Sequence, residues 1–116
     1  MFERYSFVAL TTVDLDRARD FWVNTLGFLI TEEAAGQFFI VDAGGLRLCI
    51  DRADDDIHKL GGSDPTIGLK VRAISDVLLR LASLGVVAEL SDVPGRGKYA
   101  VIRDPDGRAV IISESD

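Results

Sequence analysis

The sequence contains few residues of the kinds that hold metals or form covalent cross-links. Its 116 residues include one cysteine, Cys49, and one histidine, His58. A single cysteine excludes an intrachain disulfide, and a single histidine excludes a histidine-rich metal site. We interpret Cys49 as a pocket-lining thiol rather than a nucleophile, because no histidine lies near it in the sequence to act as a base. His58 lies in the acidic stretch 54–59, which we expect to be a solvated loop.

An excess of positive charge is also missing. Thirteen Lys and Arg residues face 19 Asp and Glu residues, so the formal net charge is −6. Because nucleic-acid binding needs a basic face to neutralise phosphates, we expect no nucleic-acid partner. No apolar run approaches the roughly 20 residues that span a bilayer. The first residues also lack the basic-then-apolar order of a secretion signal, so we expect a cytoplasmic protein that does not enter membranes.

The residues that are present indicate one soluble globular domain, residues 1–116. Apolar residues make up 47% of the chain and charged residues 28%, which is an ordinary balance for such a domain. The pattern occurs twice, over about residues 5–52 and about 65–114, with a polar linker over 53–64. A repeat of this length indicates a duplicated supersecondary unit, with a pocket between the copies.

Hydrophobic periodicity and turn residues predict the order β-α-β-β-β in each copy. Asp14 is suited to cap the first helix, and Gly27 and Gly85 are suited to end the two helices. The predicted fold class is α+β, with two βαβββ modules forming curved mixed sheets around an open cleft. The predicted strands are 7–13, 28–32, 37–42, 46–51, 66–72, 86–90, 98–103 and 109–113, the helices are 14–26 and 75–84, and the hairpin turns are 43–45 and 104–107.

These features together resemble the vicinal oxygen chelate superfamily, which includes glyoxalase I, extradiol dioxygenases, fosfomycin-resistance enzymes and bleomycin-binding proteins. The resemblance covers nearly the whole chain and implies the glyoxalase/bleomycin-resistance fold. It rests on the segments Val13 to Ala18, Phe21-Trp22, Leu26 to Phe28, Leu81 to Val86 and Arg103 to Arg108.

Metal enzymes of this superfamily hold a divalent ion with His, Gln or Glu on the first and last strands of the copies. By the resemblance, these positions fall at Phe7, Cys49, Thr66 and Ile111. Hard divalent ions need several oxygen or imidazole donors together, which this set does not supply. We therefore expect no metal, no cofactor and no catalytic residue. The alternative is an enzyme of the same superfamily, either a metal-dependent lyase or dioxygenase, or a metal-free isomerase.

The strand 46–51 alternates in a way that predicts the cleft face. Arg47, Cys49 and Asp51 share one face, and the apolar residues between them share the other, where a helix should cover them. Phe38 and Phe39 are adjacent on a strand, so one of the two faces the cleft. Trp22 either belongs to the helix core or borders the cleft. The ligand-binding residues that we expect are Trp22, Phe38, Phe39, Arg47, Cys49, Asp51, Thr66, Lys70 and Tyr99.

The resemblance implies a homodimer that binds a small organic molecule without a metal. Bleomycin-binding relatives line a groove with aromatic and acidic side chains, and a second subunit completes that groove. The acidic balance of this chain suits a cationic or aromatic drug or metabolite, which the protein would sequester to give antibiotic resistance. The two copies pair either within one chain or across the dimer.

Overall fold

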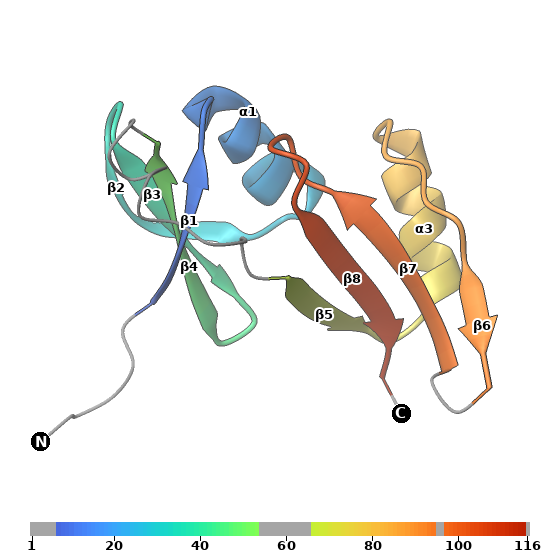
Figure 1. Ribbon diagram of the computed structural model, residues 1–116. Coiled ribbons are helices and arrows are strands. Elements are labelled where there is room, and N and C mark those ends of the chain that lie inside the picture. The colour runs from blue at the N-terminus through green and yellow to red at the C-terminus, as the bar shows by residue number, and fades with distance from the viewer. Residues whose placement is uncertain (1–6, 54–65, 95–96, 116) are drawn as a thin grey trace, which may run out of the picture. The chain divides into compact units, whose positions relative to one another are not determined.

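The computed structural model describes residues 7–53, 66–94 and 97–115 (Figure 1). The chain divides into two compact units, residues 1–64 (unit 1) and 65–116 (unit 2). Each unit contains a four-stranded mixed sheet and a helical segment, which confirms the predicted α+β class. His58 and nearly all of the predicted linker lie outside the described residues. Within the described ranges, no helix is long and apolar enough to cross a bilayer.

Unit 1 has its strands in the order β1-β4-β3-β2. Strand β1 runs parallel to β4, and the other neighbours are antiparallel. The helical segment connects β1 to β2, the two outer strands of the sheet, and packs on β4 between them. The elements are β1 (Val8–Thr12), α1 (Leu15–Arg19), η1 (Asp20–Thr25), β2 (Leu29–Ala34), β3 (Phe38–Ala43) and β4 (Leu46–Arg52).

The helical segment of unit 1 changes its winding partway along. Asp14 caps its start as predicted: the Asp14 backbone is extended, and its carboxylate accepts the Arg17 N–H at 3.1 Å. The sequence predicts one continuous helix, but the structure has an α-helix followed by the π-helix η1. The wider winding shows at its end, where the Leu26 N–H donates to the Phe21 carbonyl five residues back at 2.9 Å. Gly27 then ends the helix with a φ of +82°.

The π-helical turn buries two aromatic rings beneath the sheet. Phe21 is 6% exposed and Trp22 is 0% exposed. The two rings meet edge to face, with centroids 5.2 Å apart, and Trp22 also stacks on Phe28 at 6.2 Å. These rings form one side of the unit 1 core, and the other side comes from the sheet residues Leu10, Phe39, Val41, Leu48 and Ile50.

Unit 2 repeats the arrangement with strand order β5-β8-β7-β6. Strand β5 runs parallel to β8, and the other neighbours are antiparallel. Helix α3 packs on β8 and lies along one side of this sheet in Figure 1. The elements are β5 (Ile67–Val71), α3 (Ile74–Ser83), β6 (Ser91–Val93), β7 (Gly97–Arg103) and β8 (Ala109–Glu114).

The predicted strand 86–90 is wrong. These residues have no regular structure, and β6 instead covers Ser91–Val93. Ser91 pairs with Tyr99 and Val93 with Gly97, so β6 is antiparallel to the first part of β7. The β-branched residues at 86 and 87 favour a strand, but β-propensity does not supply a pairing partner.

Helix α3 begins without a side-chain cap of its own. Its N-cap residue, Ala73, has no side-chain acceptor. The Ile74 N–H donates instead to the Glu114 carboxylate at 3.0 Å, 40 residues along the chain. A carboxylate at a helix N-terminus satisfies a free donor and also interacts favourably with the helix dipole. Glu114 therefore fixes the start of α3 to the end of β8.

The last hairpin turn, residues 104–107, has the predicted backbone. Gly107 has a φ of +83°, and its N–H donates to the Asp104 carbonyl at 2.9 Å. The turn also contains an ion pair that the sequence did not predict. The Asp104 carboxylate accepts the Arg108 backbone N–H at 2.8 Å and pairs with Arg108 Nη1, and both side chains are at most 2% exposed. The buried pair of Asp104 and Arg108 therefore stabilises the turn together with the positive φ of Gly107.

Candidate functional site

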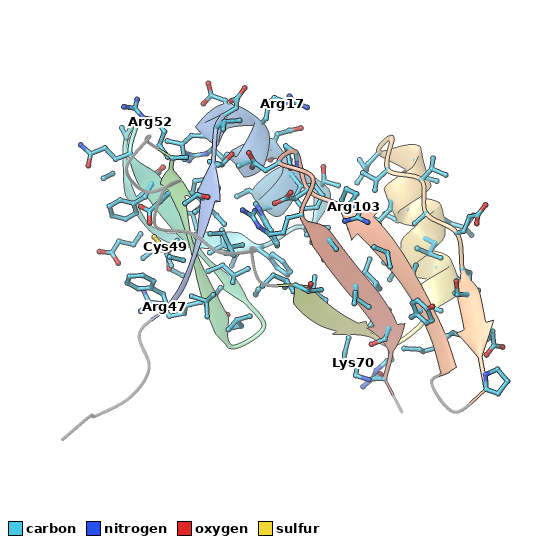
Figure 2. All side chains as sticks on the ribbon, in the orientation of Figure 1. Arg17, Arg47, Cys49, Arg52, Lys70 and Arg103 are labelled. Atoms are coloured by element: carbon cyan, nitrogen blue, oxygen red, sulfur yellow. The ribbon has the colours of Figure 1, made fainter. Side chains whose placement is uncertain are left out.

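The open face of the unit 1 sheet carries a cavity of about 400 Å³. The side chains of β4 alternate between the helix side and this open face. Leu48 and Ile50 point toward the helical segment and are 0% exposed, whereas Arg47, Cys49 and Asp51 point away from it. Figure 2 shows Arg47 and Cys49 on this strand. The cavity is lined by Phe7, Glu32, Phe38, Ile40, Arg47, Cys49 and Asp51.

The charges around this cavity do not balance. Arg47 Nη2 lies 3.6 Å from Glu32 Oε2, and both side chains are partly exposed. Asp51 adds a second carboxylate, whose Oδ2 accepts a hydrogen bond from the Cys49 thiol at 3.7 Å. Two carboxylates against one guanidinium leave the cavity with an excess negative charge. A site of this kind favours cations over anions.

Burial and the neighbouring carboxylates keep Cys49 protonated. Burial of the thiol is the largest cause, followed by the charge of Asp51 and its hydrogen bond, and the pKa of Cys49 rises to about 11. Only the thiolate is a good nucleophile, so Cys49 is unreactive near neutral pH. The nearby carboxylates of Asp51 and Glu32 raise the pKa of the thiol further, and the charge of Arg47 only partly opposes them, so the balance favours the neutral thiol.

The residues at the metal positions that the resemblance implies do not fit a metal ion. In unit 1, Phe7 has no donor atom, and the raised pKa of Cys49 opposes the thiolate that a metal would require. In unit 2, Thr66 offers one neutral hydroxyl and Ile111 offers no donor. Among the described residues, no group of three His, Cys, Asp or Glu side chains is placed to hold a metal ion.

The structure brings four of the predicted site residues together and separates two others from them. Phe38, Arg47, Cys49 and Asp51 all line the cavity. Phe39 lies one residue further along β3 and therefore faces the core, where it is 2% exposed. Trp22 is enclosed by the core aromatics. Neither Phe39 nor Trp22 lines this cavity, which agrees with the alternative in which Trp22 belongs to the helix core.

The sequence did not predict a role for Glu32 in this site, and a β-bulge explains why. Simple alternation from Ile30, which pairs with core-facing Val41, would place Glu32 on the helix side. The register shifts between Ile30 and Glu32, so Glu32 pairs with Ile40 on the open face. A bulge adds one residue to a strand and re-aims the side chains after it. Ile40, two residues after Phe38 on the same strand, could have been predicted to line the cavity by alternation.

The remaining predicted residues belong to unit 2. Lys70 lines a second cavity of about 330 Å³. Tyr99 is half-buried on β7, and Thr66 is exposed immediately before β5. The second cavity has a different lining from the first, with Lys70, Asp92, Gly97, Lys98, Ser113, Glu114 and Ser115.

Comparison with known families gives a match over almost the whole chain. Residues 4–112 match the family described as the Glyoxalase/Bleomycin resistance protein/Dioxygenase superfamily. No curated protein matches the sequence.

Solved structures with the same fold include both binding proteins and an enzyme. A bleomycin-binding protein from bleomycin-producing Streptomyces verticillus, complexed with copper(II)-bleomycin, is 24% identical with a TM-score of 0.70, and the match covers 100% of both chains. TnmS3, an antibiotic binding protein from Streptomyces sp. CB03234, is 19% identical with a TM-score of 0.72 over 100% of both chains. Lactoylglutathione lyase from Agrobacterium tumefaciens is 21% identical with a TM-score of 0.72, over 97% of this chain and 93% of that one. At these identities the likeness establishes the fold alone.

Proposed function

This chain belongs to the glyoxalase/bleomycin resistance protein/dioxygenase superfamily, and we propose that it binds a cationic aromatic small molecule without a metal. The observation that carries the proposal is the unit 1 cavity, in which aromatic rings and an excess of carboxylates line one open space. Its volume of about 400 Å³ lies within the range of small-molecule sites. Binding rather than chemistry is favoured because the cavity contains neither an activated nucleophile nor a metal-ligand set.

The aromatic and the acidic lining residues have different roles in ligand recognition. The ring of Phe38 is half-buried on the cavity face, and Phe7 is 46% exposed beside it. A planar ligand gains apolar contact and stacking from such rings. Asp51 then supplies the charge that selects a cation, since Arg47 lies beside the other carboxylate, Glu32. The bleomycin-binding and antibiotic-binding neighbours support a binding role of this type.

Within this proposal, the protein acts by sequestering its ligand, as an antibiotic-resistance protein would, in the cytoplasm and as a homodimer. Two features support pairing of chains. Strands β1 and β2 are the outer strands of the unit 1 sheet, and outer strands present unpaired backbone groups. The partly exposed ring of Phe7 at the start of β1 adds apolar surface that a second copy would cover.

Substituting Asp51 with asparagine should weaken binding of cationic aromatic compounds about tenfold. The substitution removes the selecting charge but keeps the side-chain shape, and an ion pair in a partly buried site contributes about 1.4 kcal/mol or more. Titration of a panel of cationic aromatic drugs, followed by nitrogen-15 amide shifts, measures the dissociation constants. Raising the salt concentration should weaken binding to the parent protein more than to Asp51→Asn.

Asp16→Asn is the matched control, because Asp16 lies in the first turn of α1 and carries the same charge. It should leave the affinity within about twofold of the parent. The placement of Asp51 can be checked without a ligand. Asp51→Asn should lower the pKa of Cys49, so that alkylation by iodoacetamide begins at lower pH. If that pKa falls but no cationic compound binds at millimolar concentration, the proposed function is wrong and the site geometry is right.

Elemental analysis of the purified protein should find well under one equivalent of zinc, iron, nickel or manganese per chain. The reason is the poor donor set at Phe7, Cys49, Thr66 and Ile111. The same measurement separates binding from the alternative of a metal-dependent lyase or dioxygenase. Near-stoichiometric metal that survives dialysis against a weak chelator would contradict the metal-free proposal.

A further inference from the structure

A row of four polar side chains crosses the whole unit 2 sheet. Lys70 on β5 is in register with Ser113 on β8, Ser113 with Tyr99 on β7, and Tyr99 with Ser91 on β6. Residues in register on neighbouring strands lie on the same face, with Cβ atoms about 5 Å apart. One ammonium group and three hydroxyls are therefore spread over about 15 Å, which is three strand spacings.

This row lies on the open face of the sheet. Glu114, the next residue after Ser113, reaches the N-terminus of α3 and so points to the helix side. Ile112, on the other side of Ser113, is 2% exposed in the core. Because side chains alternate along a strand, Ser113 points away from α3, and its three partners in the row do so as well. Lys70 is exposed, and the other three members are partly buried.

The row itself carries one formal charge, and that charge is positive. The second cavity, about 330 Å³, includes Lys70 and Ser113 of the row in its lining, together with Lys98 and the acidic residues Asp92 and Glu114. Glu114 is already engaged by the Ile74 N–H. Asp92 is in register with Lys98, one residue away from the row, and so belongs to the opposite face. Lys70 therefore supplies the one formal charge within the row.

Three side chains of the row have no partner among the described residues. The described residues provide no side-chain hydrogen bond or ion pair to Lys70, Ser113 or Tyr99. Hydroxyl and ammonium groups at a partly buried surface gain free energy when a ligand supplies acceptors. The corresponding row of unit 1, Thr11, Asp51, Phe38 and Ala34, is acidic and apolar instead.

We propose that the row of Lys70, Ser113, Tyr99 and Ser91 binds the oxyanion of a small hydroxylated molecule, either a carboxylate or a phosphate monoester. Lys70 pairs with the anion, and the neighbouring Ser113 and Tyr99 hydroxyls donate hydrogen bonds to its oxygens. The outer hydroxyl of Ser91 contacts the ligand's own hydroxyls. The two duplicated sheets thus carry opposite ligand preferences. This site does not depend on the cation site proposed for unit 1.

The test is a titration of the full-length protein at constant ionic strength, with glycerol phosphate, glycerate and neutral glycerol as probes. Nitrogen-15 amide shifts of Ser113 and Tyr99 report binding at the row. Lys70→Gln should weaken binding of the anionic probes about tenfold or more, because it removes the charge. Arg80→Gln is the matched control, since Arg80 lies in the last turn of α3, and it should change the affinity less than about twofold. Tyr99→Phe, which removes a single hydroxyl, should have an intermediate effect.

Saturable shifts with either anion but not with glycerol, lost in Lys70→Gln and kept in Arg80→Gln, support the site. The tighter of the two anions then identifies the preferred oxyanion. The proposal is overturned if neither anion shifts these amides at millimolar concentration. It is equally overturned if Lys70→Gln and Arg80→Gln weaken binding alike. The anions would then be attracted by the general positive charge of the protein surface and not by a site at the row.

Discussion

Asp104→Ala should lower the free energy of unfolding by about 3–5 kcal/mol, the range found when one partner of a buried ion pair is removed. The Asp104 side chain is 0% exposed and pairs with Arg108, whose side chain is 2% exposed. It also accepts the backbone N–H groups of Asp106 at 3.1 Å and Arg108 at 2.8 Å. Alanine removes all of these acceptors at once and leaves the Arg108 guanidinium buried without its carboxylate. Urea denaturation of Asp104→Ala and of the parent protein measures the difference.

The first copy provides a matched control for this change. Asp42 lies at the equivalent hairpin, where its carboxylate accepts the Gly45 N–H at 2.7 Å from an exposed position. Asp42→Ala should therefore cost only about 1 kcal/mol, as for a single exposed hydrogen bond. Adding Arg108→Met to Asp104→Ala should recover part of the lost stability, because an apolar side chain needs no partner. A loss below about 1 kcal/mol for Asp104→Ala would show that the ion pair does not stabilise the turn.

Local signals in the sequence were enough to predict most of the fold. Alternation in strand β4 predicted which of its residues face the cavity, and the structure places Arg47, Cys49 and Asp51 there. The helix cap at Asp14 and the end of the helix at Gly27 were also predicted correctly, because each depends on the backbone conformation of one or two residues. The duplicated order of elements followed from these signals and the turns.

Several features that could not be predicted depend on pairing between separate segments of the chain. The cap of α3 comes from Glu114, 40 residues away from Ile74. Glu32 reaches the cavity through a bulge, which depends on how β2 pairs with β3. Strand β6 forms where Ser91 to Val93 pair with β7, rather than at 86–90, where the β-branched residues favour a strand. Propensity and periodicity describe single segments, so they contain no information on such pairings.

The second large effect is expected at Trp22. Trp22→Ala should lower the free energy of unfolding by about 3–5 kcal/mol, because it leaves a large cavity in the unit 1 core. The side chain is 0% exposed and touches two other rings, Phe21 and Phe28. Thermal or urea denaturation measures the loss. Leu29→Ala, at a site that is 76% exposed, is the control and should cost less than about 0.5 kcal/mol.

Trp22→Phe separates the packing of this residue from any contact with a ligand. The indole Nε1 is buried without a hydrogen-bond partner, and an unsatisfied buried donor costs about 1–3 kcal/mol. Phenylalanine removes that donor together with some volume, so Trp22→Phe should be much less destabilising than Trp22→Ala. Because Trp22 does not line the unit 1 cavity, the affinity for a cationic aromatic compound should stay within about twofold. A tenfold loss of affinity in a variant that keeps its stability would place Trp22 in contact with the ligand. It would favour the alternative from the sequence in which Trp22 borders the cleft.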